Sequence, residues 1–140
     1  MSYKTIISAE NLINSLQDEN TLVFDCRCDI KDTTYGIQAY TEGHIPGSIY
    51  VNVDTDLASE KTPSSGRHPL PDADALSEKL SQWGLSSEKQ AVIYDDASGA
   101  FAGRMWWILK WLGHKKVAVL DGGLGSYMSI GGKLTTDETI

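Results

Sequence analysis

Short runs of apolar, often β-branched residues alternate along this chain with longer segments whose apolar positions recur at helical spacing. The short runs predict strands at residues 5–7, 21–24, 48–53, 91–94 and 117–120, and those at 21–24, 91–94 and 117–120 are expected to be buried. The longer segments predict helices after Ser8, after Asp72, at about Phe101 to Leu112, and in a short stretch through Met128, with a short helical turn near Tyr40. Parallel neighbouring strands need crossover connections, so this alternation predicts an α/β fold with a central parallel sheet and helices on both faces.

The connections between these elements indicate where chemistry would lie. Residues 54–71 are rich in proline, serine and glycine, which favours a long surface loop. Gly84 and Gly113 follow two of the helical segments and predict their ends. Ligands of open parallel sheets bind outside the carboxyl ends of the strands. The loops after Phe24, Tyr94 and Leu120 are therefore the candidate sites.

Composition narrows the function classes. A length of 140 residues suits one domain, and 41% hydrophobic with 22% charged residues is ordinary for a globular protein. The net charge of -7, without a cluster of lysine and arginine, argues against nucleic acid as a partner. No apolar run resembles a signal peptide or a membrane span, so we expect no membrane association and a cytoplasmic location.

The loop at residues 95–99 is the most informative one, because it joins a buried strand directly to the N-terminus of an apolar helix. Backbone N–H groups and the helix dipole at such a junction favour an anion. In a sulfur-transferring or phosphate-cleaving enzyme the anion would be a cysteine thiolate. This chain has Asp95 there, and a carboxylate cannot accept sulfane sulfur as a persulfide. Capping of the helix and loop by Asp95 and Asp96 is the favoured interpretation.

Aspartates also follow two other strands, at Asp25 and Asp121. Convergent carboxylates can hold Mg²⁺ for phosphoryl transfer, which is a rival enzymatic hypothesis. The chain lacks the D-x-D-x-[TV] signature after a strand and a lysine at a matching strand end. We therefore expect these aspartates to cap turns.

The remaining residues with reactive side chains give weaker signals. Cys26 and Cys28 are too close on an extended strand for a good disulfide, which predicts reduced thiols, with Cys26 in the core and Cys28 near the rim. A lone C-x-C pair with dispersed histidines predicts neither a metal site nor a cofactor; the histidines are His44, His68 and His114.

Two further groups of residues have structural interpretations. His44 lies in the turn Gly43-His44-Ile45-Pro46-Gly47, and we expect it to be a structural hydrogen-bonding residue rather than an acid or base. The helical tryptophans are expected to be packing residues, some of them covering a surface that another domain would bury; they are Trp106, Trp107 and Trp111.

Several segments together resemble the rhodanese family over essentially the whole chain. The matching pieces are Val23-Phe24-Asp25-Cys26-Arg27, Gly43-His44-Ile45-Pro46-Gly47-Ser48, Gly66-Arg67-His68-Pro69-Leu70-Pro71, Val92-Ile93-Tyr94-Asp95, Arg104-Met105-Trp106-Trp107 and Val119-Leu120-Asp121-Gly122-Gly123. The third and fifth pieces narrow the resemblance to the first domain of tandem thiosulfate or 3-mercaptopyruvate sulfurtransferases.

The resemblance implies a rhodanese-like fold and a non-catalytic role. In such tandem proteins the first domain typically has aspartate at the cysteine position, here Asp95, and a C-terminal catalytic domain carries the persulfide-forming cysteine. The family moves sulfane sulfur from a small anionic donor to a thiophilic acceptor. By resemblance, His68 lines the cleft between domains, and Arg67 adds positive charge towards the donor. The alternative for both residues is an exposed loop without a ligand.

The resemblance also implies boundaries. We expect a rhodanese-like domain at residues 1–134 and the start of an interdomain linker at residues 135–140, whose polar composition differs from the preceding sequence. The catalytic domain would then belong to the same polypeptide. The competing hypothesis is a stand-alone, non-catalytic module that binds a partner protein.

Overall fold

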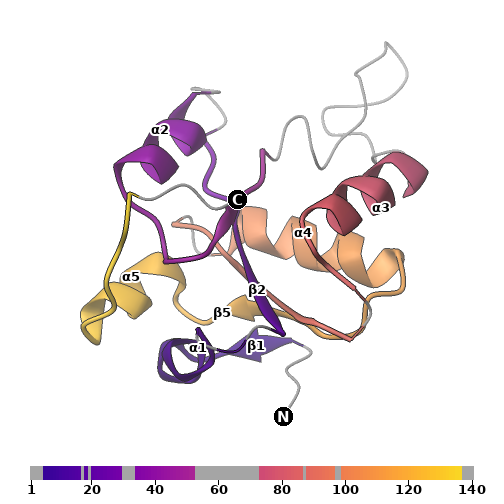
Figure 1. Cartoon of the computed structure of the whole chain (residues 1–140). Helices are drawn as coiled ribbons and strands as arrows, with labels where there is room; N and C mark the ends of the chain where they lie inside the picture. Colours follow the sequence, from indigo (N-terminus) through magenta and orange to yellow (C-terminus); the bar gives the residue numbers. More distant parts are fainter. Residues whose placement is uncertain are drawn as a thin grey trace.

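The computed structural model describes residues 5–16, 18, 20–29, 34–52, 73–86, 88–96 and 99–136. Within these residues five strands alternate with five helices (Figure 1). The strands are β1 (Ile6–Ile7), β2 (Thr21–Asp25), β3 (Ile49–Tyr50), β4 (Gln90–Tyr94) and β5 (Val117–Leu120), and the helices are α1 (Ala9–Ser15), α2 (Tyr35–Glu42), α3 (Ala73–Gln82), α4 (Ala100–Trp111) and α5 (Gly123–Ser129). All strands are parallel, in the order β1-β5-β4-β2-β3, which confirms the predicted sheet.

Helices cover both faces of the sheet, so the core has two parts (Figure 1). The side chains of β4 alternate between them, as a period of two residues requires. Ala91 and Ile93 pack into a cluster with α3 and α4, whereas Val92 and Tyr94 pack into a cluster with α1 and α5. A strand that is buried on both faces reads as a continuous apolar run, which is how residues 91–94 appear in the sequence.

The helix ends agree with the local sequence signals. The side chain of Ser8 accepts a hydrogen bond from the N–H of Asn11 at 3.1 Å, which caps α1. Gly84 and Gly113, with φ of 96° and 94°, end α3 and α4 in the left-handed conformation that favours glycine.

The elements around β3 differ from the prediction. The helix near Tyr40 is α2, with eight residues rather than a single turn, because the buried Tyr40 anchors it by donating to the carbonyl of Ser48 at 2.6 Å. Strand β3 is shorter than residues 48–53; among the described residues it lies at the edge of the sheet and pairs with β2 alone. The N–H of Val51 still donates to the carbonyl of Asp25 at 2.8 Å.

Two predicted segments can be compared only in part with this structure. The loop at residues 54–71 lies outside the described residues. At the other end, the backbone N–H groups of His44 and Thr135 each donate to the other residue's carbonyl, at 2.9 and 2.8 Å, so the chain is still bound to the domain at Thr135. Among the described residues, none of the helices has the length and apolar character needed to cross a membrane.

Candidate functional site

The carboxyl ends of β2, β4 and β5 meet at one edge of the parallel sheet and bring three aspartates to it. Asp25 is the last residue of β2, Asp95 follows β4, and Asp121 follows β5. Asp25 and Asp95 are buried, with at most 1% of their surface exposed, whereas Asp121 is exposed. Burial of a carboxylate is costly unless hydrogen bonds or a cation compensate it. The two buried aspartates are therefore the residues whose partners matter.

The carboxylate of Asp95 lies at the N-terminus of α4, where it accepts hydrogen bonds from three backbone N–H groups of the described residues. One oxygen accepts the N–H of Gly99 at 2.9 Å, and the other accepts the N–H groups of Phe101 and Ala102, both at 2.9 Å. The positive end of the helix dipole adds to this stabilisation. The predicted capping role of Asp95 is thus confirmed, and we call these three N–H groups the Asp95 cradle.

The main chain of Asp95 is also hydrogen-bonded. Its carbonyl oxygen accepts the N–H of Leu124 at 3.0 Å, which ties β4 to α5. A Cβ atom at Gly123 would lie 2.7 Å from that oxygen, so only glycine allows the approach. The neighbouring Asp96 is exposed and accepts a hydrogen bond from the hydroxyl of Tyr35 at the start of α2.

A cavity of about 530 Å³ borders the Asp95 cradle. Its lining is acidic and rich in glycine: it comprises Ile6, Asp95, Asp96, Gly99, Val119, Leu120, Asp121, Gly122, Gly123 and Gly125. In the described part of the chain, this cavity included, no group of three or more histidine, cysteine, aspartate or glutamate side chains could hold a metal ion. Asp95 and Asp25 each have other partners, which disfavours the phosphoryl-transfer hypothesis.

Asp25 was expected only to cap a turn, but it also forms an ion pair with Arg27, a partner that the sequence analysis did not identify. Its Oδ1 accepts the N–H of Arg27 at 2.9 Å, as in a turn, but its carboxylate also forms a buried ion pair with the guanidinium of Arg27 at 2.7 Å. Its Oδ2 further accepts the hydroxyl of Tyr94 at 2.9 Å. An aspartate and an arginine separated by one residue at the end of a buried strand was the available signal.

The guanidinium of Arg27 is held by two elements. Besides Asp25 it donates from Nη2 to the carbonyl of Gly43 at 2.7 Å, which links β2 to the end of α2. Burial alone would lower the pKa of Arg27, but the hydrogen bond and charge of Asp25 outweigh it and raise that pKa above its ordinary value. Arg27 is therefore a permanent cation in the interior.

His44 is structural, as predicted. It is 1% exposed, its ring stacks on Tyr40 with centroids 3.7 Å apart, and its Nδ1 lies 2.7 Å from the carbonyl oxygen of Tyr40. A carbonyl oxygen only accepts, so Nδ1 carries the proton.

The two cysteines also lie where the sequence predicted. Neither forms a disulfide. Cys26 is buried with its thiol 3.5 Å from the sulfur of Met105, and Cys28 is half-buried against the cluster under α3 and α4. Neither lines the cavity at Asp95. Arg67 and His68, the predicted donor-binding residues, lie outside the described residues.

Comparisons with known proteins agree with this architecture. A family model for the rhodanese-like domain matches residues 8–129. The chain is 43% identical to the "Probable 3-mercaptopyruvate sulfurtransferase" of Pseudomonas aeruginosa, covering 99% of this chain and 50% of that protein. It is 32% identical to thiosulfate/3-mercaptopyruvate sulfurtransferase 2 of Arabidopsis thaliana, covering 90% of this chain and 36% of that protein.

Solved structures give the same result. The 3-mercaptopyruvate sulfurtransferase of Leishmania major superposes with a TM-score of 0.86 at 27% identity, covering 96% of this chain and 37% of that one. This chain spans half or less of the length of each of these relatives. The family model, the sequence identities and the fold agree, and the chain belongs to the rhodanese-like domain family.

Proposed function

We propose that this chain is the non-catalytic N-terminal half of a tandem sulfurtransferase, a protein that transfers sulfane sulfur from thiosulfate or 3-mercaptopyruvate to a thiophilic acceptor. The names of its relatives support the substrate class, and their length leaves room for a second domain in the same polypeptide. In this proposal the chain packs against a catalytic C-terminal domain and shapes the cleft between the two. His68 and Arg67 would face the anionic donor from this side.

The observation that carries the proposal is the carboxylate in the Asp95 cradle. A sulfurtransferase forms a persulfide when a thiolate attacks the transferable sulfur of the donor, whose bond to the rest of the molecule breaks so that sulfite or pyruvate leaves; the helix N-terminus keeps that thiolate ionised. A carboxylate satisfies the same N–H groups but forms no stable bond to sulfane sulfur. Cys26 packs in the core against Met105, away from the cradle, so neither its position nor its surroundings suit it to replace Asp95.

The contacts of Asp95 and Asp96 suggest what the domain contributes instead. The side chain of Asp95 binds α4, its carbonyl binds α5, and Asp96 binds Tyr35 of α2. Three helices are thereby joined at one edge of the sheet. A surface fixed in this way can support a neighbouring domain without losing much conformational entropy when it docks.

The test is to assay the chain alone with thiosulfate and cyanide, and with 3-mercaptopyruvate and a thiol acceptor. We expect no turnover above that of a Cys26→Ser/Cys28→Ser variant. Turnover that persists in the double variant would refute the non-catalytic role. A natural reading frame that continues into a second domain with a cysteine in the corresponding loop would support the tandem arrangement.

A second arm asks whether the loop alone explains the lack of activity. In an Asp95→Cys variant the new thiol would lie in the Asp95 cradle, and we expect its pKa to fall below the value of about 8.5 for an ordinary cysteine. It should therefore react with iodoacetamide at neutral pH. The measurement uses a chain that also carries Cys28→Ser, so that the half-buried Cys28 does not react as well. We expect no full recovery of sulfur transfer, since the catalytic loop of the other half is absent. Full recovery would show that the substitution of one residue accounts for the inactivity.

A further inference from the structure

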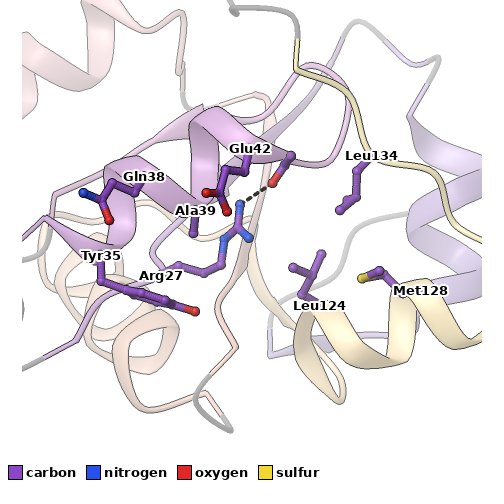
Figure 2. Close-up of a pocket in the computed structure, with 9 residues that line it drawn as sticks. Arg27, Tyr35, Gln38, Ala39, Glu42, Leu124, Met128 and Leu134 are labelled. Atoms are coloured by element: carbon purple, nitrogen blue, oxygen red, sulfur yellow. Dashed lines mark hydrogen bonds between the residues drawn. The ribbon is translucent and has the colours of Figure 1, made fainter.

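A second cavity, separate from the one at Asp95, lies between α2 and α5 and has a volume of about 350 Å³. Figure 2 shows α2 with Gln38 and Glu42 on one side of it, and α5 with Leu124 and Met128 on the other. The guanidinium of Arg27 lies between these two walls. This combination of a buried cation, a carboxylate and an apolar wall in one small cavity has no part in the proposed sulfur chemistry.

Arg27 presents a fixed hydrogen-bond donor to this cavity. Its Nε donates to Asp25 at 3.0 Å, and its Nη2 donates to Asp25 and to the carbonyl of Gly43, both at 2.7 Å. Among the described residues no hydrogen-bond partner engages Nη1, and Figure 2 shows the end of the guanidinium turned towards the space beside Leu124. A guanidinium already held by other partners binds a carboxylate with little loss of side-chain entropy.

The charge around this donor selects against a simple anion. Asp25 balances much of the charge of Arg27, and Glu42 places a second carboxylate on the wall that α2 forms. Figure 2 shows the Glu42 side chain on the same side of the helix as the guanidinium. A ligand that carries only a carboxylate would meet repulsion from Glu42, whereas one that also carries an ammonium group would gain an ion pair.

The opposite wall requires an apolar group on the ligand. Leu124 is buried, Leu134 is half-buried, and Met128 is 51% exposed at the edge of the cavity. Methionine adapts its shape to different apolar partners. A volume of about 350 Å³ is at the lower end of the range for small-molecule sites, so the apolar group is short.

We propose that this cavity binds a zwitterionic α-amino acid with a short aliphatic side chain. Its carboxylate accepts from Nη1 of Arg27, its ammonium group pairs with Glu42, and its side chain lies against Leu124 and Met128. The proposal does not depend on the sulfurtransferase assignment, because it uses neither the Asp95 cradle nor either cysteine.

The first test uses L-leucine as the probe in an NMR titration of the 140-residue chain. We expect saturable shifts at residues of α2 and α5, with a Kd on the order of 1 mM. The probes 4-methylpentanoate, which lacks the ammonium group, and 3-methylbutylamine, which lacks the carboxylate, should bind about tenfold more weakly. Equal binding of L-leucine and 4-methylpentanoate, or no saturable shifts with L-leucine, would overturn the proposal.

Two exposed positions allow the contacts to be tested without a risk to folding. Glu42→Gln should weaken L-leucine binding about fivefold but leave 4-methylpentanoate unaffected or bound more tightly. Met128→Gln should weaken both probes by about threefold, because it removes apolar contact alone. Glu78→Gln, a matched change of an exposed glutamate on α3, should alter neither. Unchanged L-leucine affinity in Glu42→Gln would contradict the proposed ammonium contact.

Discussion

Two adjacent strands, β2 and β4, each lead to a buried carboxylate at their carboxyl ends, and the two carboxylates are stabilised in different ways. Asp25 on β2 and Asp95 after β4 are both buried carboxylates at the same edge of the sheet. Asp25 is balanced by the guanidinium of Arg27 and by the hydroxyl of Tyr94. Asp95 is balanced by main-chain N–H groups at the start of α4. One carboxylate therefore depends on particular side chains, and the other on backbone that any sequence in that conformation would supply.

The two sites therefore differ in which residues they can accept. The Asp25 network needs a carboxylate, because a buried guanidinium without its counter-ion is costly. The Asp95 cradle needs only an anion of suitable size, because the donors are peptide groups. In the function proposed above, a thiolate occupies the corresponding cradle of the catalytic domain. The residue at position 95 can thus differ between a catalytic and a structural domain while the fold stays the same.

The largest effect is expected from Asp25→Ala. The substitution leaves Arg27 buried without its ion-pair partner, and loss of one partner of a buried pair costs about 3–5 kcal/mol. The free energy of unfolding in urea, measured at pH 7, should fall by that amount.

Asp121→Ala is the matched control, because Asp121 also lies at the carboxyl end of a strand but is exposed. Its effect should stay within about 0.5 kcal/mol. If the two variants were equally stable, the ion pair of Asp25 and Arg27 would contribute little, and the contrast with Asp95 would be lost.

A smaller loss is expected from Asp95→Ala. Three N–H donors lose their acceptor, so we expect a loss of about 2 kcal/mol in urea unfolding. Asp96→Ala should cost less than about 1 kcal/mol, because Asp96 is exposed and its partner among the described residues is the hydroxyl of Tyr35. A larger loss at position 96 than at position 95 would contradict the assignment of the cap.

The elements of this fold could be predicted from the sequence because their signals are local. Residues 91–94 are apolar without interruption, and Ser8 and Gly113 mark helix ends by their own chemistry. Asp95 could be predicted as a cap for the same reason, since it directly precedes the helix that it binds. The errors arise where a local signal is not enough. The length of α2 depends on the contact between Tyr40 and Ser48, which becomes apparent only in three dimensions.

The candidate sites could be predicted only in part. The interaction of Arg27 with Gly43 joins residues sixteen positions apart, and the cavity between α2 and α5 combines segments separated by more than eighty residues of sequence. No periodicity or motif places such segments together. The roles of Arg67 and His68 came from resemblance to a family, and they stay predictions because those residues are not among the described ones.

Apart from the exposed control positions, the smallest effect is expected at Tyr94, which connects Asp25 with Asp95. Its hydroxyl donates to Asp25 and accepts the N–H of Ile45 at 3.2 Å, while the next residue in the chain is Asp95. Tyr94→Phe removes these hydrogen bonds but keeps the ring, so we expect a loss of about 1–2 kcal/mol at pH 7, by the same urea measurement.

The pH dependence of this variant sharpens the test. Burial, followed by the negative charge of Asp25, raises the pKa of Tyr94 above its ordinary value. The folded protein then keeps the phenolic proton at a pH where the unfolded chain loses it, so stability should decline as the pH rises above about 10. Tyr94→Phe has no such proton, so its loss of stability at alkaline pH should be shallower than that of the original chain. The pKa values of Tyr127 and Tyr35 are also raised, and these residues account for part of the loss that remains in the variant. Parallel declines would mean that Tyr94 ionises as easily in the folded protein as in the unfolded chain, and that the Asp25 network is open to solvent like the cavity at Asp95.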